Sequence, residues 1–589
     1  MKNLVIVLKR SVLAGLLGSG MGLGIGPAGI GLAGAAWAVT PDRPMPASVL
    51  DESITATGSY LAGRHAQQTD DWPAAAEFMG RALAIDPQNT GLLRRIYLLR
   101  LGDGKMAEAV ELARQVITVE PGNHLAKLLL AADDVNAGRF DDAGRRLAGA
   151  SDDGLARFIE PILKAWIAVA KGDAAGAQAA LAPIENAQGF SILHHFHAGL
   201  IAEYTGDPVT AESWFLKSLG SGSPLRIIQA VGGFFERAGK TEEAKAFYES
   251  FRGSNPDTLL LQPELDRLSR GEKPAPIVAS PRDGMAEALF DIASALNQEG
   301  AGDMALMYGR IALHLRGDLS LARMMVGDIL QQRGLLADAL AQYGEVKGDA
   351  ALQWTARLRS ASVLERMKRG DEAVGLLTAM AAERPDRSDA LLELGDIHRG
   401  AERYEQAIAA YGDALTRIGT LQPRHWVILY ARAMTYDKLK RWEDAERDLL
   451  RANDLSPDQA FLLNYLGYSW IDRGVNLERG KTMIQRAGEL KPTDGYIIDS
   501  LGWALYRMED FAGAVTNLER AVELKPLDPT INDHLGDAYW QVGREAEARF
   551  QWRRALLHAE EDDMKSAING KLENGLPRNR TAASQAIPK

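Results

Sequence analysis

The sequence predicts an all-α fold, a right-handed superhelix of about fourteen tandem helix-turn-helix units arranged in two stacks. Three observations predict it. Glycine or alanine returns every 34 residues through most of the 589-residue chain. Proline returns at another fixed offset of the same repeat, and the composition is rich in alanine and glycine without the β-branched pattern of strands. A repeat of this length indicates an α-solenoid, in which each unit buries its apolar face only against its neighbours.

The repeat is clearest in residues 497–526. If Gly502 is position 8 of a 34-residue unit, position 20 is Ala514 and position 32 is Pro526. Position 20 then recurs through the chain at Ala75, Ala109, Ala143, Ala177, Ala211, Ala244, Ala305, Ala339, Ala373, Ala407, Ala445, Gly480, Ala514 and Ala548. Apart from an interruption at residues 253–284, the steps are 33 to 38 residues, and the longer ones map to loops, where insertions are tolerated.

The residue types at the fixed positions have a packing explanation. Positions 8, 20 and 27 lie where the first helix of a unit crosses the second helix and the next unit, and a close crossing leaves room only for Gly or Ala. Large apolar residues at positions 4, 7, 11 and 24 fill the space between helices, as Leu501, Leu505 and Leu518 do in one unit. Proline at position 32 ends the second helix. Glycine ends the first helix, and we assign this turn to Gly102, Gly138, Gly172 and Gly334.

These residues resemble the tetratricopeptide repeat (TPR) family over most of residues 55–560, most strongly in the last three units. The resemblance implies the TPR superhelix and protein–protein binding. It does not identify a partner, because one fold serves many functions.

The N-terminus has the layout of a secretory signal. Residues 1–10 are short and basic, residues 11–36 are apolar and uncharged, and Ala36-Trp37-Ala38 is a small-x-small cleavage site. We expect cleavage after Ala38 and a periplasmic chain of a Gram-negative bacterium, associated with the envelope but without stable membrane insertion. The alternative is an uncleaved anchor, since the apolar run is long enough to span a bilayer.

The rest of the chain divides by composition. We expect an extended lead-in at 39–54, an N-terminal array at 55–256 and a C-terminal array at 285–560. A linker or crossover is expected at 257–284, where Pro274, Pro276 and Pro281 lie close together. Residues 561–576 predict a capping amphipathic helix, and residues 577–589 a disordered tail.

No catalytic signal is present. The chain has no cysteine, no phosphate-binding loop, no HExxH and no GxSxG motif, so we expect neither an enzyme nor a cofactor. His194 and His197 share a helix face, but two imidazoles without a third ligand make a poor zinc site, and we predict no metal. The net charge of −11 argues against nucleic-acid binding.

What remains is a binding surface on the concave side, formed by the first helices. Aromatic and acidic residues occupy the corresponding positions of the last three units, and the predicted partner-binding residues are Tyr468, Asp499, Trp503, Tyr506, Asp533, Asp537 and Trp540. Some TPR proteins hold a C-terminal carboxylate with Lys and Asn at these places. Here aspartates replace them, so a basic or apolar segment is the expected ligand. Packing of the rings on their neighbours is the alternative.

The signal, the long array and the C-terminal block at 463–526 together resemble the LbcA-like envelope TPR proteins, which partner a C-terminal processing protease. This resemblance implies an adaptor that recruits and activates such a protease and delivers cell-wall hydrolases to it. The absence of a lipobox cysteine departs from lipid-anchored members. Two alternatives stay open: an assembly factor for outer-membrane or exopolysaccharide export machinery, and an enzyme.

Overall fold

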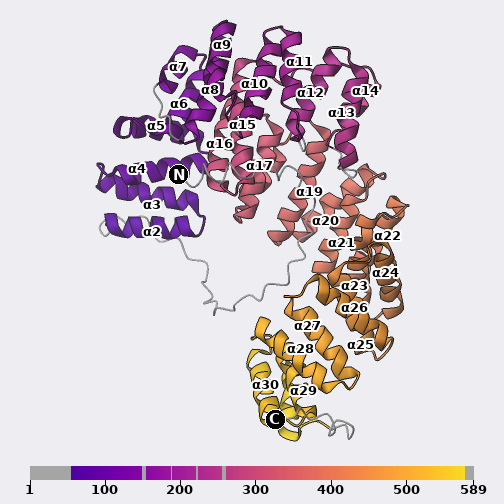
Figure 1. The fold of residues 1–589 in the computed structure, drawn as a ribbon. Coiled ribbons are helices and arrows are strands. Elements are labelled where there is room, and N and C mark those ends of the chain that lie inside the picture. The colour runs from indigo at the N-terminus through magenta and orange to yellow at the C-terminus, as the bar shows by residue number, and fades with distance from the viewer. Residues whose placement is uncertain (1–54, 149–153, 188, 221–222, 255–259, 578–589) are drawn as a thin grey trace. The chain divides into compact units, whose positions relative to one another are not determined.

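The computed structural model describes residues 55–577, except 149–153, 188, 221–222 and 255–259 (Figure 1). The predicted signal peptide and lead-in, and all but the first residue of the predicted tail, lie outside the described residues. Within them the chain forms 30 α-helices and no strand, so the predicted all-α solenoid is confirmed. None of the described helices combines the length and apolar character that crossing a bilayer requires.

The chain divides into two compact units at residues 369 and 370. Unit 1 contains α2 (Ala56–Gln68), α3 (Trp72–Ile85), α4 (Thr90–Gly102), α5 (Met106–Val119), α6 (His124–Asn136), α7 (Phe140–Leu147), α8 (Ala156–Ala170), α9 (Ala174–Leu181), η2 (Ala182–Ile184), α10 (Ser191–Tyr204), α11 (Pro208–Lys217), α12 (Leu225–Arg237), α13 (Thr241–Ser254), α14 (Gln262–Ser269), α15 (Pro281–Gln298), α16 (Gly302–Leu315), α17 (Ser320–Gln332), α18 (Leu336–Gly344) and α19 (Ala350–Arg366).

Unit 2 begins with α20 and ends with a single helix. It contains α20 (Gly370–Glu383), α21 (Asp389–Gly400), α22 (Tyr404–Ile418), η3 (Pro423–His425), α23 (Trp426–Lys438), α24 (Trp442–Leu455), α25 (Ala460–Asp472), α26 (Leu477–Leu490), α27 (Gly495–Arg507), α28 (Phe511–Leu524), α29 (Pro529–Gln541), α30 (Glu545–His558) and α31 (Asp562–Asn574). Helix α31 lies where the sequence predicted a capping helix.

The turn inside each helix pair is set by one left-handed residue, seven positions after position 8. Three of the predicted turn residues have this conformation, namely Gly138, Gly172 and Gly334. The prediction of Gly102 is wrong, because Gly104 (φ 78°) makes that turn. Gly102 ends α4 and faces the Trp72 ring instead. Five pairs place a larger residue in this conformation, namely Asp70, Lys368, Glu402, Lys440 and Glu509. A positive φ costs such residues energy that glycine avoids.

Position 8 packs directly on position 24, sixteen residues later. An added Cβ at Gly199 would lie 2.6 Å from the Phe215 ring, and one at Gly536 would lie 2.5 Å from the Trp552 ring. Where position 8 is alanine, as in Ala433, position 24 is the smaller Leu449, and both are fully buried. The two positions therefore share one volume, which explains the glycine and alanine repeat in the sequence.

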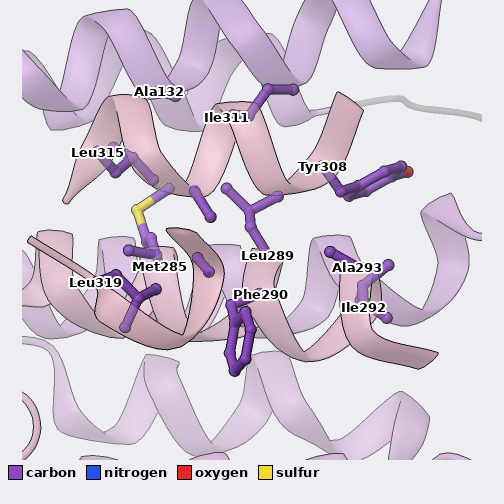
Figure 2. Packing of buried hydrophobic residues seen from close by; sticks show 14 of the residues in the cluster. Ala132, Met285, Leu289, Phe290, Ile292, Ala293, Tyr308, Ile311, Leu315 and Leu319 are labelled. Carbon is purple, nitrogen blue, oxygen red and sulfur yellow. The ribbon is translucent and has the colours of Figure 1, made fainter. Parts of the chain in front are cut away.

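The described part of the predicted linker or crossover lies within unit 1. Residues 262–269 form α14, and α15 and α16 then fold back onto the first helices of the N-terminal pairs: α15 contacts α8 and α10, and α16 contacts α4 and α6. Figure 2 shows Met285 and Leu289 of α15 and Ile311 and Leu315 of α16 in this core, with Ala132 of α6. One buried cluster therefore runs through both sides of the expected boundary, and the compact units divide elsewhere.

Polar contacts hold the folded-back helices in place. The buried Arg310 of α16 donates from Nε to the Gly102 carbonyl at 3.1 Å. Glu287 of α15 is fully buried and accepts from Nε of Arg226 and from a guanidinium nitrogen of Arg316, each at 2.9 Å. Gly284 lies against the Trp166 ring, where a Cβ would come within 2.2 Å. The first helices of these N-terminal pairs are therefore covered by α15 and α16 of the same chain.

Candidate functional site

The candidate site lies on the first helices of the last pairs in unit 2. These helices contact one another, α25 with α27 and α27 with α29, more closely than the second helices α26, α28 and α30 do. In a stack of helix pairs, the more closely spaced layer is the concave one. We call the surface of α25, α27 and α29 that carries positions 5, 9 and 12 the inner face.

A ladder of stacked rings crosses the inner face. The Trp503 ring lies between Tyr506, with centroids 4.9 Å apart, and His534, 4.1 Å apart, and the three rings are nearly parallel. Trp503 and Tyr506 are half-buried. Stacking of this kind fixes the ring orientations before any ligand arrives, so little rotamer entropy is lost on binding.

On the α25 and α27 part of the inner face, two buried polar atoms have no hydrogen-bond partner among the described residues. They are Nε1 of Trp503, a donor, and Oδ1 of Asn464, an acceptor. Tyr468 lies on the same helix as Asn464, and burial, followed by the charges of Asp472 and Asp499, raises its pKa to about 12. A donor and an acceptor left unpaired beside aromatic rings are suited to the backbone of a bound segment.

Asp499, one of the predicted partner-binding residues, is largely buried. It is 6% exposed, and its carboxylate accepts from Nδ1 of His534 at 3.0 Å. Burial disfavours charge on His534, but the carboxylates of Asp499, Asp533 and Asp537 together outweigh burial and raise the pKa of the imidazole. Asp499 therefore positions His534, which in turn supports the Trp503 ring.

The last three predicted residues are covered by the chain's own C-terminal segment. Asp537 is 5% exposed and Trp540 8% exposed, so neither of these predicted partner-binding side chains is open to solvent. Lys571 of α31 donates to Oδ2 of Asp533 at 2.7 Å and to Oδ2 of Asp537 at 2.8 Å. Trp540 donates from Nε1 to the Leu576 carbonyl at 2.7 Å. Of the seven predicted residues, Tyr468, Trp503 and Tyr506 remain on the accessible part of the inner face.

Sequence reasoning missed His534 and Lys571. The repeat contained a signal for the second: Gly570 follows Gly536, and Lys571 follows Asp537, by one 34-residue step. Helix α31 is thus in register with the first helices, and Lys571 stands at position 9 of a further unit. His534 carried no comparable signal, because its role depends on the buried carboxylate of a neighbouring helix.

The histidines of α10 are structural. Trp166 donates from Nε1 to Nδ1 of His197 at 3.1 Å, so Nε2 carries the proton and donates to Asp291 of α15 at 3.2 Å. His194 is buried edge-on against Trp214, with centroids 5.1 Å apart. Burial, then the neighbouring His195, lowers the pKa of His194. Within the described ranges, no group of three or more His, Asp or Glu side chains is arranged to hold a metal ion.

Known proteins share the repeat. The family model of the tetratricopeptide repeat matches residues 358–423, 386–460 and 500–563. The TPR repeat-containing protein PA4667 of Pseudomonas aeruginosa is 30% identical over 194 residues, which are 33% of this chain, and the chain spans only 32% of that relative's length.

Solved structures with a similar arrangement include MamA and yeast Tom70. The crystal structure of MamA is 21% identical and covers 32% of this chain and 96% of its own, with a TM-score of 0.26. Tom70 is 13% identical and covers 88% of this chain and 95% of its own, with a TM-score of 0.32.

Proposed function

Because the chain contains tetratricopeptide repeats, we propose that it is a non-catalytic scaffold whose inner face, around Trp503, binds a basic or apolar segment of a protein partner. Repeats of this family bind protein partners, and the position of the site in this chain is our inference. The observation that carries it is the buried, unpaired donor of Trp503 beside the unpaired acceptor of Asn464.

Energetics favour a ligand at this place. A buried polar group without a partner costs about 1–3 kcal/mol. A segment whose carbonyl accepts from Trp503 and whose N–H donates to Asn464 removes two such costs. The flanking rings of Tyr468 and Tyr506 add apolar area, and the neighbouring Asp472 is exposed and acidic, which favours a basic segment over an acidic one.

The repeat register supports the same location. Asn464 of α25 has the same repeat position as Asp533 of α29. Trp503 of α27 has the same repeat position as Lys571 of α31. A salt bridge between Asp533 and Lys571 joins α29 and α31. Oδ1 of Asn464 and Nε1 of Trp503 are unpaired. A segment lying across α25 and α27 supplies their hydrogen-bond partners.

We further propose that the chain works outside the cytoplasm, in the periplasm, and that it recruits and activates a C-terminal processing protease and delivers its substrates. The apolar N-terminal segment with its small-x-small site supports export. The similarity to the LbcA-like envelope TPR proteins supports the protease partner.

Affinity capture tests the function. The tagged chain is incubated with periplasmic extract, bound proteins are identified by mass spectrometry, and the variant Trp503→Ala with Tyr468→Ala is compared with Phe550→Ala. Phe550 is the matched control, an aromatic residue 54% exposed on the second helix α30.

We expect the double variant to weaken capture of the partner by more than about 2 kcal/mol, roughly 30-fold, and the control to capture it normally. Equal capture by all three proteins would reject the inner face as the site. Capture of a β-barrel or a polysaccharide synthase in place of a protease would assign the assembly role instead.

A further inference from the structure

The C-terminal helix α31 packs against α30 and reaches inner-face residues of α29 through Lys571. Lys571 Nζ lies between two carboxylates, 2.7 Å from Asp533 and 2.8 Å from Asp537. Ile568 is fully buried in the cluster that contains Leu535 and Trp552. Lys571 and Ile568 thus supply one cation and one apolar side chain to the surface of α29 and α30.

The chain that follows α31 completes the cover. The Trp540 indole donates to the Leu576 carbonyl, and Gln541 Nε2 donates to the Pro577 carbonyl at 3.0 Å. Gly575, with φ of 69°, lies so close to the Trp540 ring that a Cβ would come within 2.1 Å. This backbone approach puts main-chain carbonyls opposite side-chain donors of α29, as a peptide ligand would.

Helix α31 is weakly anchored compared with the helix that it covers. Ten of the thirteen residues of α29 are buried, whereas only Ile568 is buried in the thirteen residues of α31. The free energy that local opening requires falls with the buried apolar contacts of a segment. Helix α31 therefore opens more easily than α29 or α30.

The acidic pair defines what can replace α31. Asp537 is buried in its present surroundings, and one oxygen of Asp533 is buried without a hydrogen-bond partner. Removing one partner from a buried charge pair leaves an uncompensated charge, which is costly. Any macromolecule that covers Asp533 and Asp537 must therefore supply a cation in place of Lys571.

We propose that α31 is an internal occupant of the aspartate end of the inner face, and that a helical partner segment carrying one lysine displaces it. The partner lysine takes the place of Lys571 between Asp533 and Asp537, and an apolar residue one turn earlier takes the place of Ile568. This inference rests on the proposed scaffold function and names the chemistry of the partner. In the resting chain α31 limits access, so partner affinity depends on its release.

A peptide titration on the full-length chain tests the proposal. The probe is a fluorescently labelled peptide with the sequence of residues 561–577. It is added to the wild type, to Lys571→Glu, and to Lys565→Glu as the matched control. Lys565 also lies on α31, where its ammonium donates to the Glu560 carbonyl and pairs with Asp562 of the same segment. Hydrogen exchange of α31 in each protein reports whether the helix is released.

We expect Lys571→Glu to release α31, seen as faster exchange there with α29 unchanged, and to bind the peptide at least tenfold more tightly than wild type. Lys565→Glu should behave as wild type, and a peptide carrying Lys571→Glu should not bind the opened chain. Lys571→Met, which removes the charge without adding a repulsive one, repeats the test if Lys571→Glu lowers the melting temperature of the whole chain.

Two results would overturn the proposal: α31 exchange unchanged in both Lys571 variants, or a released α31 with no peptide binding. Either result leaves the capture experiment on Trp503 untouched, so failure here is distinguishable from failure of the scaffold function.

Discussion

The shared volume of positions 8 and 24 predicts a compensating pair of substitutions in α10 and α11. An added Cβ at Gly199 would lie 2.6 Å from Cδ1 and 2.8 Å from Cε1 of Phe215, whereas non-bonded carbons prefer about 3.5–4.0 Å. The ring cannot withdraw, because Phe215 is fully buried and its centroid lies 5.3 Å from that of Phe234. Gly199→Ala should therefore overpack the crossing.

The expected magnitudes follow from two opposing effects. Alanine improves helix propensity over glycine by up to about 1 kcal/mol, and overpacking costs about 1–3 kcal/mol, so Gly199→Ala should destabilise by about 1–2 kcal/mol. Phe215→Leu alone removes ring contacts and should cost about 1–2 kcal/mol. The double variant recreates the pair Ala165 and Leu181, both fully buried in the preceding unit. We expect a favourable coupling of about 1–2 kcal/mol.

The assay is a double-mutant cycle. A chain with two compact units need not unfold in one step, so the opening free energy is measured by native-state hydrogen exchange of α10 and α11 in all four proteins. Effects of the two substitutions that add to within about 0.4 kcal/mol would refute the shared-volume account.

Two further predictions concern unit 2. Lys440 holds φ of 58° in the turn after α23, so Lys440→Gly should stabilise unit 2 by about 1 kcal/mol. The same change at Arg447, inside α24, should destabilise unit 2 by about 1 kcal/mol. Urea unfolding measures both effects, and a loss of stability in Lys440→Gly would contradict the turn argument. His534, which faces Asp499, Asp533 and Asp537, has a raised pKa in the folded chain, so its contribution to stability is complete below the unfolded value of about 6.5 and is lost as the pH rises through the folded value. The melting temperature of unit 2 should therefore fall as the pH rises across this range. His534→Gln should remove the part of this pH dependence that His534 causes, and an unchanged pH profile in the variant would contradict this role of His534.

The fold could be predicted because its main constraint is local and periodic. Gly502 and Leu518, or Ala433 and Leu449, lie sixteen residues apart in one helix pair, so the sequence alone displays both partners of the crossing. The turn residue was harder, because Lys440 adopts a conformation that its residue type does not favour. Its backbone is imposed by the end of one helix and the start of the next.

The covered surfaces could not be predicted, because they depend on contacts between distant segments. The return of α15 and α16 depends on Gly284 meeting Trp166, more than a hundred residues earlier in the chain. The burial of Trp540 depends on the Leu576 carbonyl, in a segment whose composition indicated only a cap. For Trp503 the aromatic character predicted a place on the inner face, and the structure adds its unpaired donor.

Site-specific photo-crosslinking tests the central claim most directly. A photoreactive benzoylphenylalanine is placed at position 468, in place of Tyr468 on the inner face, and separately in place of Phe550 on α30, and adducts formed in living cells are identified by mass spectrometry. The account predicts a partner protein attached at position 468 and not at position 550. No adduct at position 468, or the same adducts at both positions, would contradict it.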